Sequence, residues 1–378
     1  MNAKKDPESN RGVKNIGIDL TSLKPLRITG LEVYALNLAS ALLDLHVPSI
    51  SWTIFLPRSG SSFARTHFKG VHCCISPLDN RIFNDQVWLP FQFMKRAIHT
   101  MYCPTFPPSP IIASKCIITI PDTTLWDFPE TASFGGRYYY KRLYEFAASR
   151  ARLVFTISES TKRRLGLRFP ARNVLLARCS LDTSIYSTQA SAAGANRIRS
   201  QFGLHGRVLL FVGTIEPRKN ISTLIEAFLK LDRGFHPCTL LLVGRLAWGR
   251  ELADAYRGFT DIVFTGYIDR ESIAACYQIA DLVVLPSHYE GFGLPILEAF
   301  HFQQLVCCSR IEAHAEVAGD AAVYFDPDSV DELVDAISSC LRLSARERGV
   351  FLEKQRRRLD EFSWEVAAKS IVSGVDLL

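Results

Sequence analysis

The second half of the chain alternates short apolar runs with amphipathic segments, and this alternation limits the possible folds more than any other feature. Apolar runs at 207–212, 239–243 and 262–266 each end at or next to a glycine, and the segments at 221–231 and 270–279 carry apolar residues at helical spacing. Strands without polar alternation that are joined by helices are typical of a parallel sheet with both faces covered. The first half shows the same alternation less regularly.

We therefore predict an α/β protein of two Rossmann-like domains, which a length of 378 residues allows. Serine and alanine crowd the stretch 187–194, which we interpret as the linker, so that the domains span 1–186 and 187–361. Further strands are expected at 15–20, 51–56, 116–120, 153–157, 282–285, 305–308 and 322–325, and further helices at 31–43 and 331–343. Ligand sites in such domains lie at the carboxyl ends of the strands.

Composition excludes several classes of protein. A net charge of +6 suits an anionic ligand but is too small to indicate a nucleic-acid partner. The polar start at 1–14 is not typical of a signal peptide, and no apolar run approaches the ~20 residues of a membrane span. The ten cysteines include no C-x-x-C pair, which indicates reduced, buried thiols in a cytoplasmic protein. Asp326 and Asp328 are interpreted as part of a helix cap, so no metal site is predicted.

A glycine-rich turn at 288–299 is the most informative local feature. It follows the strand at 282–285, with Glu290 and Glu298 on either side of the turn and Pro295 at the start of a helix. The order of strand, glycine loop and helix presents free backbone N–H groups and the positive end of a helix dipole to an anion. Glu298, expected in the first helical turn, either accepts hydrogen bonds from a nucleotide ribose or only stabilises the dipole.

Two adjacent cations occupy the loop that follows the strand at 207–212. The planar fork of Arg218 and the point charge of Lys219 suit phosphate oxygens, and together they can supply the charge of a divalent metal. Such a pair alone is usually a solvated surface pair, but its combination with Glu290 in one domain favours a functional role. Asn220 is predicted to cap the helix at 221–231.

Together these motifs resemble those of the family 4 glycosyltransferases, which are retaining enzymes of the GT-B fold. Matching segments occur in the family's order along nearly the whole chain: Thr29-Gly30, Thr156 to Ser160, Gly213 to Asn220, Thr265 to Tyr267, Pro286 to Glu298, Phe325 to Pro327 and Phe362 to Glu365. The resemblance implies two Rossmann-like domains that face each other across a cleft. The N-terminal domain would bind the acceptor and the C-terminal domain the nucleotide sugar, while a last helix within 362–378 crosses back to the N-terminal domain.

The resemblance also implies roles for individual residues. Arg218 and Lys219 match the residues that hold the donor diphosphate, Glu298 matches the ribose ligand, and Glu290 matches the carboxylate that faces the transferred sugar. The implied donor site also contains Gly30, Gly213, Tyr267, Gly291, Phe292, Gly293 and Leu294. Glu290, Arg218 and Lys219 are also the expected catalytic residues, together with Asp122.

The chain departs from the family pattern after the strand at 116–120. Many relatives carry His-Asp there, whereas this chain reads Pro121-Asp122. A proline side chain cannot donate a hydrogen bond to a sugar or to a reacting oxygen. Asp122 either orients the acceptor hydroxyl or caps a turn, and the sequence leaves both roles open.

The expected reaction is a front-face displacement that retains the anomeric configuration. Arg218, Lys219 and the helix near Leu294 would stabilise the leaving diphosphate, whose oxygen can take the acceptor proton, so neither a metal, a cofactor nor a protein nucleophile is expected. The expected donor is GDP-mannose or a UDP-hexose, and the expected acceptor is a saccharide or lipid-linked saccharide of surface polysaccharide or lipopolysaccharide biosynthesis. The alternatives are a sugar-nucleotide epimerase or a glycogen-type phosphorylase on the same fold, or a non-catalytic nucleotide-sugar-binding protein.

Aromatic and basic residues crowd the stretch 134–155. It holds Arg137, Tyr138, Tyr139, Tyr140, Lys141, Arg142, Tyr144, Arg150 and Arg152. Faces of this composition suit the headgroup layer of a membrane, so peripheral contact with the cytoplasmic face is one interpretation. An ordinary amphipathic helix packed on the sheet explains the same pattern.

Overall fold

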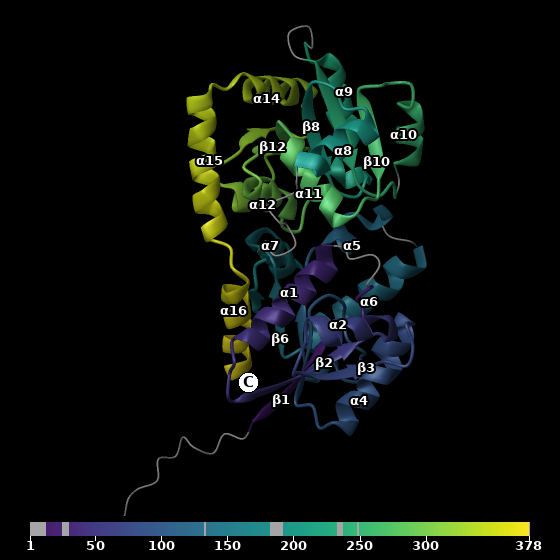
Figure 1. Ribbon diagram of the computed structural model, residues 1–378. Helices are drawn as coiled ribbons and strands as arrows, with labels where there is room; N and C mark the ends of the chain where they lie inside the picture. Colours follow the sequence, from purple (N-terminus) through teal and green to yellow (C-terminus); the bar gives the residue numbers. More distant parts are fainter. Residues whose placement is uncertain are drawn as a thin grey trace, which may run out of the picture. The chain divides into compact units, whose positions relative to one another are not determined.

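The computed structural model describes residues 13–24, 30–131, 134–181, 192–232, 237–247 and 249–377. These residues form two compact units, each built on one parallel sheet (Figure 1). The first unit comprises Met1–Ile157, Thr161–Cys179 and Trp364–Leu378, and the second comprises Ser158–Ser160 and Ser180–Ser363. The domain boundary predicted between 186 and 187 lies outside the described residues.

The first unit contains a seven-stranded sheet in the order β3-β2-β1-β4-β5-β6-β7. Its strands are β1 (Lys14–Asp19), β2 (Ile50–Leu56), β3 (His72–Ile75), β4 (Thr100–Cys103), β5 (Cys116–Thr119), β6 (Leu153–Thr156) and β7 (Val174–Leu176). Its helices are α1 (Gly30–Asp44), α2 (Ser61–Thr66), α3 (Arg81–Phe83), a π-helix (Asn84–Trp88), α4 (Leu89–Lys95), α5 (Thr124–Asp127), α6 (Phe134–Arg150) and most of α7 (Glu159–Arg168). The last helix, α16 (Trp364–Asp376), packs on α1, with the Trp364 and Tyr34 ring centroids 5.8 Å apart.

The second unit contains a six-stranded parallel sheet in the order β10-β9-β8-β11-β12-β13. Its strands are β8 (Arg207–Val212), β9 (Cys238–Val243), β10 (Ile262–Gly266), β11 (Leu282–Leu285), β12 (Leu305–Ser309) and β13 (Val323–Phe325). Its helices are α8 (Ala192–Phe202), α9 (Ile221–Lys230), α10 (Arg250–Ala255), α11 (Arg270–Ile279), α12 (Leu294–His301), α13 (Glu312–Ala318), α14 (Val330–Arg342) and α15 (Ala345–Asp360). Counted from β8, this is the strand order of a Rossmann fold.

Helices cover the sheets, and this explains the apolar strands of the sequence. Every residue of β9 is buried, and α9 turns Leu224, Ile225 and Phe228 inward. Full burial of one such side chain is worth about 1.5–3 kcal/mol relative to exposure, so the helical face and the strand hold each other in place. All ten cysteines are free and all but Cys73 are buried, as the sequence predicted.

The predicted fold class is confirmed in both halves. In the second half every predicted strand and helix is present within one residue of its predicted ends. In the first half β3, β4 and β7 were not predicted. These three strands have only three or four residues each, and runs that short are ambiguous in a sequence, although β11 and β13, which are as short, were predicted.

Candidate active site

The candidate site lies where the strand order of the second sheet reverses. Strands β8 and β11 are neighbours in the sheet although β9 and β10 separate them in the sequence. The loop at 213–220 follows β8 and the loop at 286–293 follows β11, and the His288 N–H donates to the Arg218 carbonyl at 2.9 Å. A reversal of strand order leaves a crevice at the carboxyl ends of the strands, which is the usual ligand site of such sheets.

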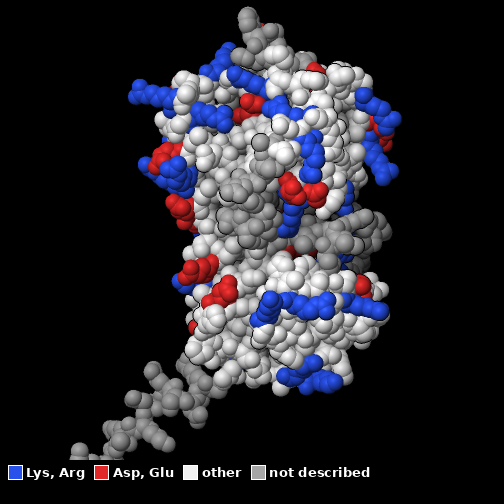
Figure 2. Space-filling model, in the orientation of Figure 1, with Lys and Arg blue, Asp and Glu red and all other residues white. Residues whose placement is uncertain are grey.

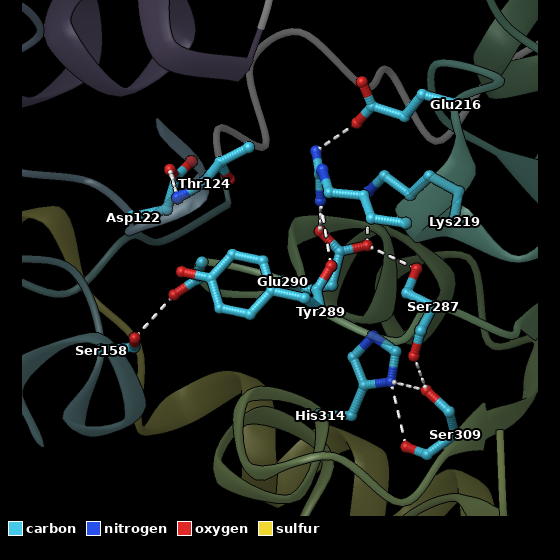
Figure 3. A network of polar contacts seen from close by, with 12 residues as sticks. Asp122, Thr124, Ser158, Glu216, Lys219, Ser287, Tyr289, Glu290, Ser309 and His314 are labelled. Carbon is cyan, nitrogen blue, oxygen red and sulfur yellow. Dashed lines mark hydrogen bonds and ion pairs between the residues drawn. The ribbon is translucent and has the colours of Figure 1, made fainter. Parts of the chain in front are cut away.

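The two cations of the first loop converge on Glu290 of the second. Arg218 Nη1 donates to Glu290 Oε2 at 3.1 Å and to the Tyr289 carbonyl at 3.0 Å, while Nη2 pairs with Glu216 Oε1 at 2.6 Å. Lys219 Nζ pairs with Glu290 Oε1 (Figure 3). The side chains of Arg218, Lys219 and Glu290 are 16%, 9% and 12% exposed, so the cluster is largely removed from water. Two carboxylates thus neutralise two cations in this structure.

Burial and ion pairing act in opposite directions on the charges of this cluster. Burial alone would raise the pKa of Glu290, but the nearby Lys219 and Arg218 charges outweigh it and hold that pKa well below its usual range. Burial lowers the pKa of Lys219, against the attraction of Glu290. The charged form of each side chain is therefore stabilised by its partners. Removing one partner leaves a buried charge unpaired, which costs free energy.

A second row of polar side chains supports Glu290, and no sequence motif marks it. Ser287 Oγ donates to Glu290 Oε1 at 2.8 Å, and Ser309 Oγ donates to the Ser287 carbonyl at 2.5 Å. His314 Nδ1 lies 3.1 Å from both the carbonyl and the hydroxyl oxygen of Ser309, so the neutral ring carries its hydrogen on Nδ1 (Figure 3). Burial lowers the pKa of His314 to about 4, so the ring is neutral near pH 7. A lone histidine on an amphipathic helix has no motif that would mark it.

The glycine elbow lies between this cluster and α12. Gly293 has a φ of 115°, a backbone conformation that glycine adopts and other residues rarely do. Helix α12 begins directly after it at Leu294, and Pro295 in its first turn has no N–H. The Ile296 N–H donates to the Gly293 carbonyl at 3.0 Å, so the Leu294 N–H is the donor that the first turn leaves without a helical partner. The Gly291 carbonyl accepts from Ser158 Oγ at 2.6 Å, and Phe292 is buried against Phe362.

Glu298 lies just beyond the first helical turn, where the sequence predicted it. It is the fifth residue of α12, in the second turn, and its Oε2 accepts from the Tyr277 hydroxyl at 2.6 Å. Tyr277 is buried and stacks on Phe302 with the ring centroids 5.4 Å apart, which fixes the hydroxyl. The expected first-turn position is missed by one residue, because a first turn counted from Leu294 ends at Leu297.

The prediction that the Asn220 side chain caps α9 is also wrong. Asn220 occupies the cap position with a left-handed backbone (φ 56°), which asparagine tolerates better than most residues. Its side chain makes other contacts: Nδ2 donates to the Pro327 carbonyl and Oδ1 accepts from Thr223 Oγ1, each at 2.7 Å. Ser329 alone provides the side-chain cap of α14, by accepting from the Glu332 N–H at 3.1 Å.

The other predicted residues lie outside the ion-pair cluster. Gly213 directly follows β8, and Tyr267 follows the edge strand β10 with 62% of its surface exposed. Gly30 is the first residue of α1 in the first unit, and Thr29 lies outside the described residues. Asp122, also in the first unit, accepts the Thr124 N–H on Oδ1 at 2.8 Å and so forms the turn that leads into α5.

Two features are absent from the described residues. No group of three His, Cys, Asp or Glu side chains in them is arranged to hold a metal ion. Of the described helices, none is both long and apolar enough to cross a membrane.

Comparison with known proteins gives one family. The family described as "Glycosyl transferases group 1" matches residues 195–361. The O-antigen chain mannosyltransferase B of Escherichia coli is 30% identical over 279 residues, which are 70% of this chain and 71% of that enzyme. The serotype-specific mannosyltransferase WbdA of Escherichia coli is 27% identical over 254 residues, which are 63% of this chain but only 30% of WbdA. The crystal structure of HepE from Anabaena with UDP and glucose superposes with a TM-score of 0.71 at 16% identity, covering 97% of this chain and 100% of that chain.

Proposed function

The chain belongs to the group 1 glycosyltransferases and has their GT-B fold, and we propose that it transfers a hexose, with mannose favoured, from a nucleoside diphosphate sugar. The acceptor in this proposal is a saccharide or lipid-linked saccharide of surface polysaccharide or lipopolysaccharide biosynthesis, and the anomeric configuration is retained. The relatives named as O-antigen and serotype-specific mannosyltransferases support the choice of sugar and process. HepE, whose structures contain UDP or UDP-glucose, supports the class of donor.

The observation that carries the proposal is the convergence of Arg218 and Lys219 on one buried carboxylate beside the start of α12. A donor diphosphate brings two or more negative charges and many acceptor oxygens, and Arg218 and Lys219 together offer a planar fork and a point charge. When it binds, the diphosphate would replace part of the negative charge that Glu290 and Glu216 now place beside Arg218 and Lys219. Glu290 would then be released to face the sugar, as the family resemblance implies.

The same groups explain how the leaving group would be stabilised. As the bond between the sugar and the diphosphate breaks, negative charge grows on the phosphate oxygen. Preorganised donors in a site removed from water stabilise such charge strongly. Arg218, Lys219 and the Leu294 N–H at the start of α12 are donors of this kind, so the proposed reaction needs neither a metal nor a cofactor.

The proposed proton path does not use a protein base. The phosphate oxygen that leaves can take the proton of the attacking acceptor hydroxyl on the same face of the sugar. Asp122 has its Oδ1 engaged by the Thr124 N–H, and we assign it the task of orienting the acceptor hydroxyl with its remaining carboxylate oxygen. Pro121 contributes no donor there.

We further propose that the protein works in the cytoplasm and touches the membrane peripherally through 134–155. Within α6 the aromatic side chains divide: Tyr144 is buried and donates to the Thr105 carbonyl, whereas Tyr138 and Phe146 are 64% and 40% exposed. Arg142 lies over the Tyr138 ring at 5.5 Å from its centroid. Reversing the charges of Arg137, Lys141 and Arg142 should abolish binding to anionic liposomes, and unchanged binding would remove this part of the proposal.

A panel of GDP- and UDP-sugars tests the proposed donor. Thermal unfolding with each compound should show one base that stabilises the protein by about 1–3 kcal/mol more than the others at saturating ligand. Transfer or slow hydrolysis of that donor must then be detected, and Arg218→Gln should lower its kcat/KM by about 10²–10³-fold. Glu332→Gln, a carboxylate at the cap of α14, serves as a control that should keep full activity. Absence of stabilisation by every nucleotide sugar would refute the proposal.

A further inference from the structure

The segment 81–95 of the first unit exposes a continuous apolar face. Ile82, Val87, Phe91 and Met94 are 57%, 56%, 53% and 65% exposed, along α3, the π-helix and α4. Their spacings of five, four and three residues place the four side chains on the same side of the segment. Hydrogen bonds join residues five apart in the π-helix and four apart in the α-helix, so side chains at these spacings lie above one another. The opposite face, with Trp88, Leu89 and Phe93, is buried in the core. The exposed face is therefore not needed to hold the segment in place.

Beyond the buried Asp85, which pairs with Arg81, the charges that follow in the sequence are positive. The sequence from 86 to 121 contains no Asp or Glu. Lys95 closes α4 and lies with Nζ 5.8 Å from the Phe91 ring centroid, and Arg96 follows it. Long basic side chains that run along exposed apolar groups are typical of the border between the hydrocarbon and the headgroups of a membrane.

A basic pocket adjoins the end of this segment. It has a volume of about 450 Å³ and is lined by Lys14, Ala97, Ile98, His99, Thr100, Lys115, Arg152 and Val375. These residues come from the amino-terminal ends of β1 and β4, the loop after α4, the residues just before β5 and β6, and the end of α16. In Figure 1 the start of β1, the helix α4 and the end of α16 occupy the same end of this unit, and Figure 2 shows Lys and Arg side chains there. The pocket thus lies at the amino ends of the strands, opposite to their carboxyl ends.

The polar side chains of the pocket are hydrogen-bond donors. Lys14 Nζ is held by the Val375 carbonyl at 3.0 Å, and Arg152 Nη1 by Thr100 Oγ1 at 2.9 Å. The Asn15 N–H donates to His99 Nδ1 at 2.9 Å, so the neutral His99 ring carries its hydrogen on Nε2 and donates from there. Within the described part of the chain, neither Lys14, Lys115 nor Arg152 pairs with a carboxylate. Three cations gathered without a counter-charge select an anion with several acceptor oxygens.

We propose that this pocket binds the phosphate headgroup of an anionic phospholipid, while the apolar face of 81–95 enters the outer part of the same bilayer. A free phosphate would satisfy the pocket alone, but it would leave the four large apolar side chains beside it exposed to water. The inference goes beyond sugar transfer and deepens the membrane contact proposed for 134–155, because Arg152 belongs to that stretch and α6 packs against the residues before β5.

Vesicle sedimentation of the full chain, without any sugar nucleotide, tests the proposal. The protein should bind vesicles that contain phosphatidylglycerol and bind pure phosphatidylcholine vesicles much less. The double variant Lys115→Gln/Arg152→Gln removes two exposed cations and should weaken partitioning about fivefold per cation. The variant Phe91→Gln/Met94→Gln should weaken it about tenfold or more by removing the apolar contact.

A matched control removes two exposed cations from the second unit. Arg356→Gln/Arg357→Gln changes the net charge equally on α15, and its partitioning should stay within about twofold of the parent protein. All variants should keep the parent's rate of sugar transfer to a water-soluble acceptor, so a failure of the proposed sugar chemistry and a failure of this proposal are separable. Equal vesicle binding by the parent and the Lys115→Gln/Arg152→Gln variant would overturn it. The proposal would also be overturned if the Lys115→Gln/Arg152→Gln variant lost binding of inorganic phosphate but still bound vesicles. That result would assign the pocket to a free anion.

Discussion

Replacing Glu290 by glutamine separates the structural task of this carboxylate from the binding of a diphosphate. Glu290 pairs with both Arg218 and Lys219 in a site where these side chains are 16% and 9% exposed. Removing one partner of a buried ion pair usually costs about 3–5 kcal/mol. Because Glu216 still pairs with Arg218, we expect the lower end, about 3 kcal/mol. For a domain of this size that is a fall in Tm of about 6–12 °C.

The same substitution should make pyrophosphate a better ligand. In the parent protein a diphosphate must compete with Glu290 for the two cations, whereas in Glu290→Gln it meets cations that lack their carboxylate. A tenfold lower Kd adds about 1.4 kcal/mol of stabilisation at a saturating ligand concentration. Pyrophosphate should therefore raise the Tm of the variant by about 3–6 °C more than it raises that of the parent protein.

The assay is thermal unfolding with and without pyrophosphate near neutral pH, with Glu298→Gln as the matched control. Glu298 contacts the Tyr277 hydroxyl outside the ion-pair cluster, so its loss should leave the pyrophosphate shift unchanged and reduce the shift caused by a nucleoside diphosphate. An equal or smaller pyrophosphate shift in Glu290→Gln than in the parent protein would mean that the diphosphate does not bind to Arg218 and Lys219.

Three further changes test other parts of the account. Burial holds the pKa of His314 at about 4, below its unfolded value of 6.5, so the free energy of unfolding should fall by up to about 3 kcal/mol as the pH falls from 6.5 to 4. His314→Asn can still donate to the Ser309 carbonyl and should flatten this part of the pH–stability curve. Parallel curves for the parent protein and the variant would contradict this expectation. Gly293→Ala forces a φ of 115° on alanine, which should cost about 1–3 kcal/mol in denaturant unfolding and weaken nucleotide binding, and an unchanged unfolding midpoint would argue against the strain. Asp122→Asn keeps the acceptor for the Thr124 N–H but replaces the carboxylate oxygen that would orient the acceptor hydroxyl, so kcat should fall about 10²-fold with Tm unchanged; full activity would leave Asp122 only as a turn cap.

Local sequence patterns were sufficient for the strands of the second unit because these are mostly apolar runs without polar alternation. The runs 207–212 and 282–285 carry the unbroken apolar signal of a parallel strand, and the structure places strands there without change. Short strands such as β3 and β7 carry only three or four residues, and their pairing with β2 and β6 is a tertiary event that no local pattern reports.

The candidate site shows the same division between local and long-range information. Arg218, Lys219 and Glu290 could be named because each belongs to a loop that follows a recognisable strand. That Glu216 also pairs with Arg218, and that Ser287, Ser309 and His314 support Glu290, depends on how β12 and α13 pack beside β11. Contacts between elements distant in sequence leave no mark on the spacing of residues, so the charged residues of the site were predictable but the side chains that hold them were not.

The most direct test of the central claim is a crystal structure of the protein with a nucleoside diphosphate bound. We expect the phosphate oxygens within hydrogen-bonding distance of Arg218, Lys219 and the Leu294 N–H at the start of α12, with the ribose hydroxyls at Glu298. A diphosphate bound elsewhere, with the pairs from Arg218 and Lys219 to Glu290 unchanged, would contradict it.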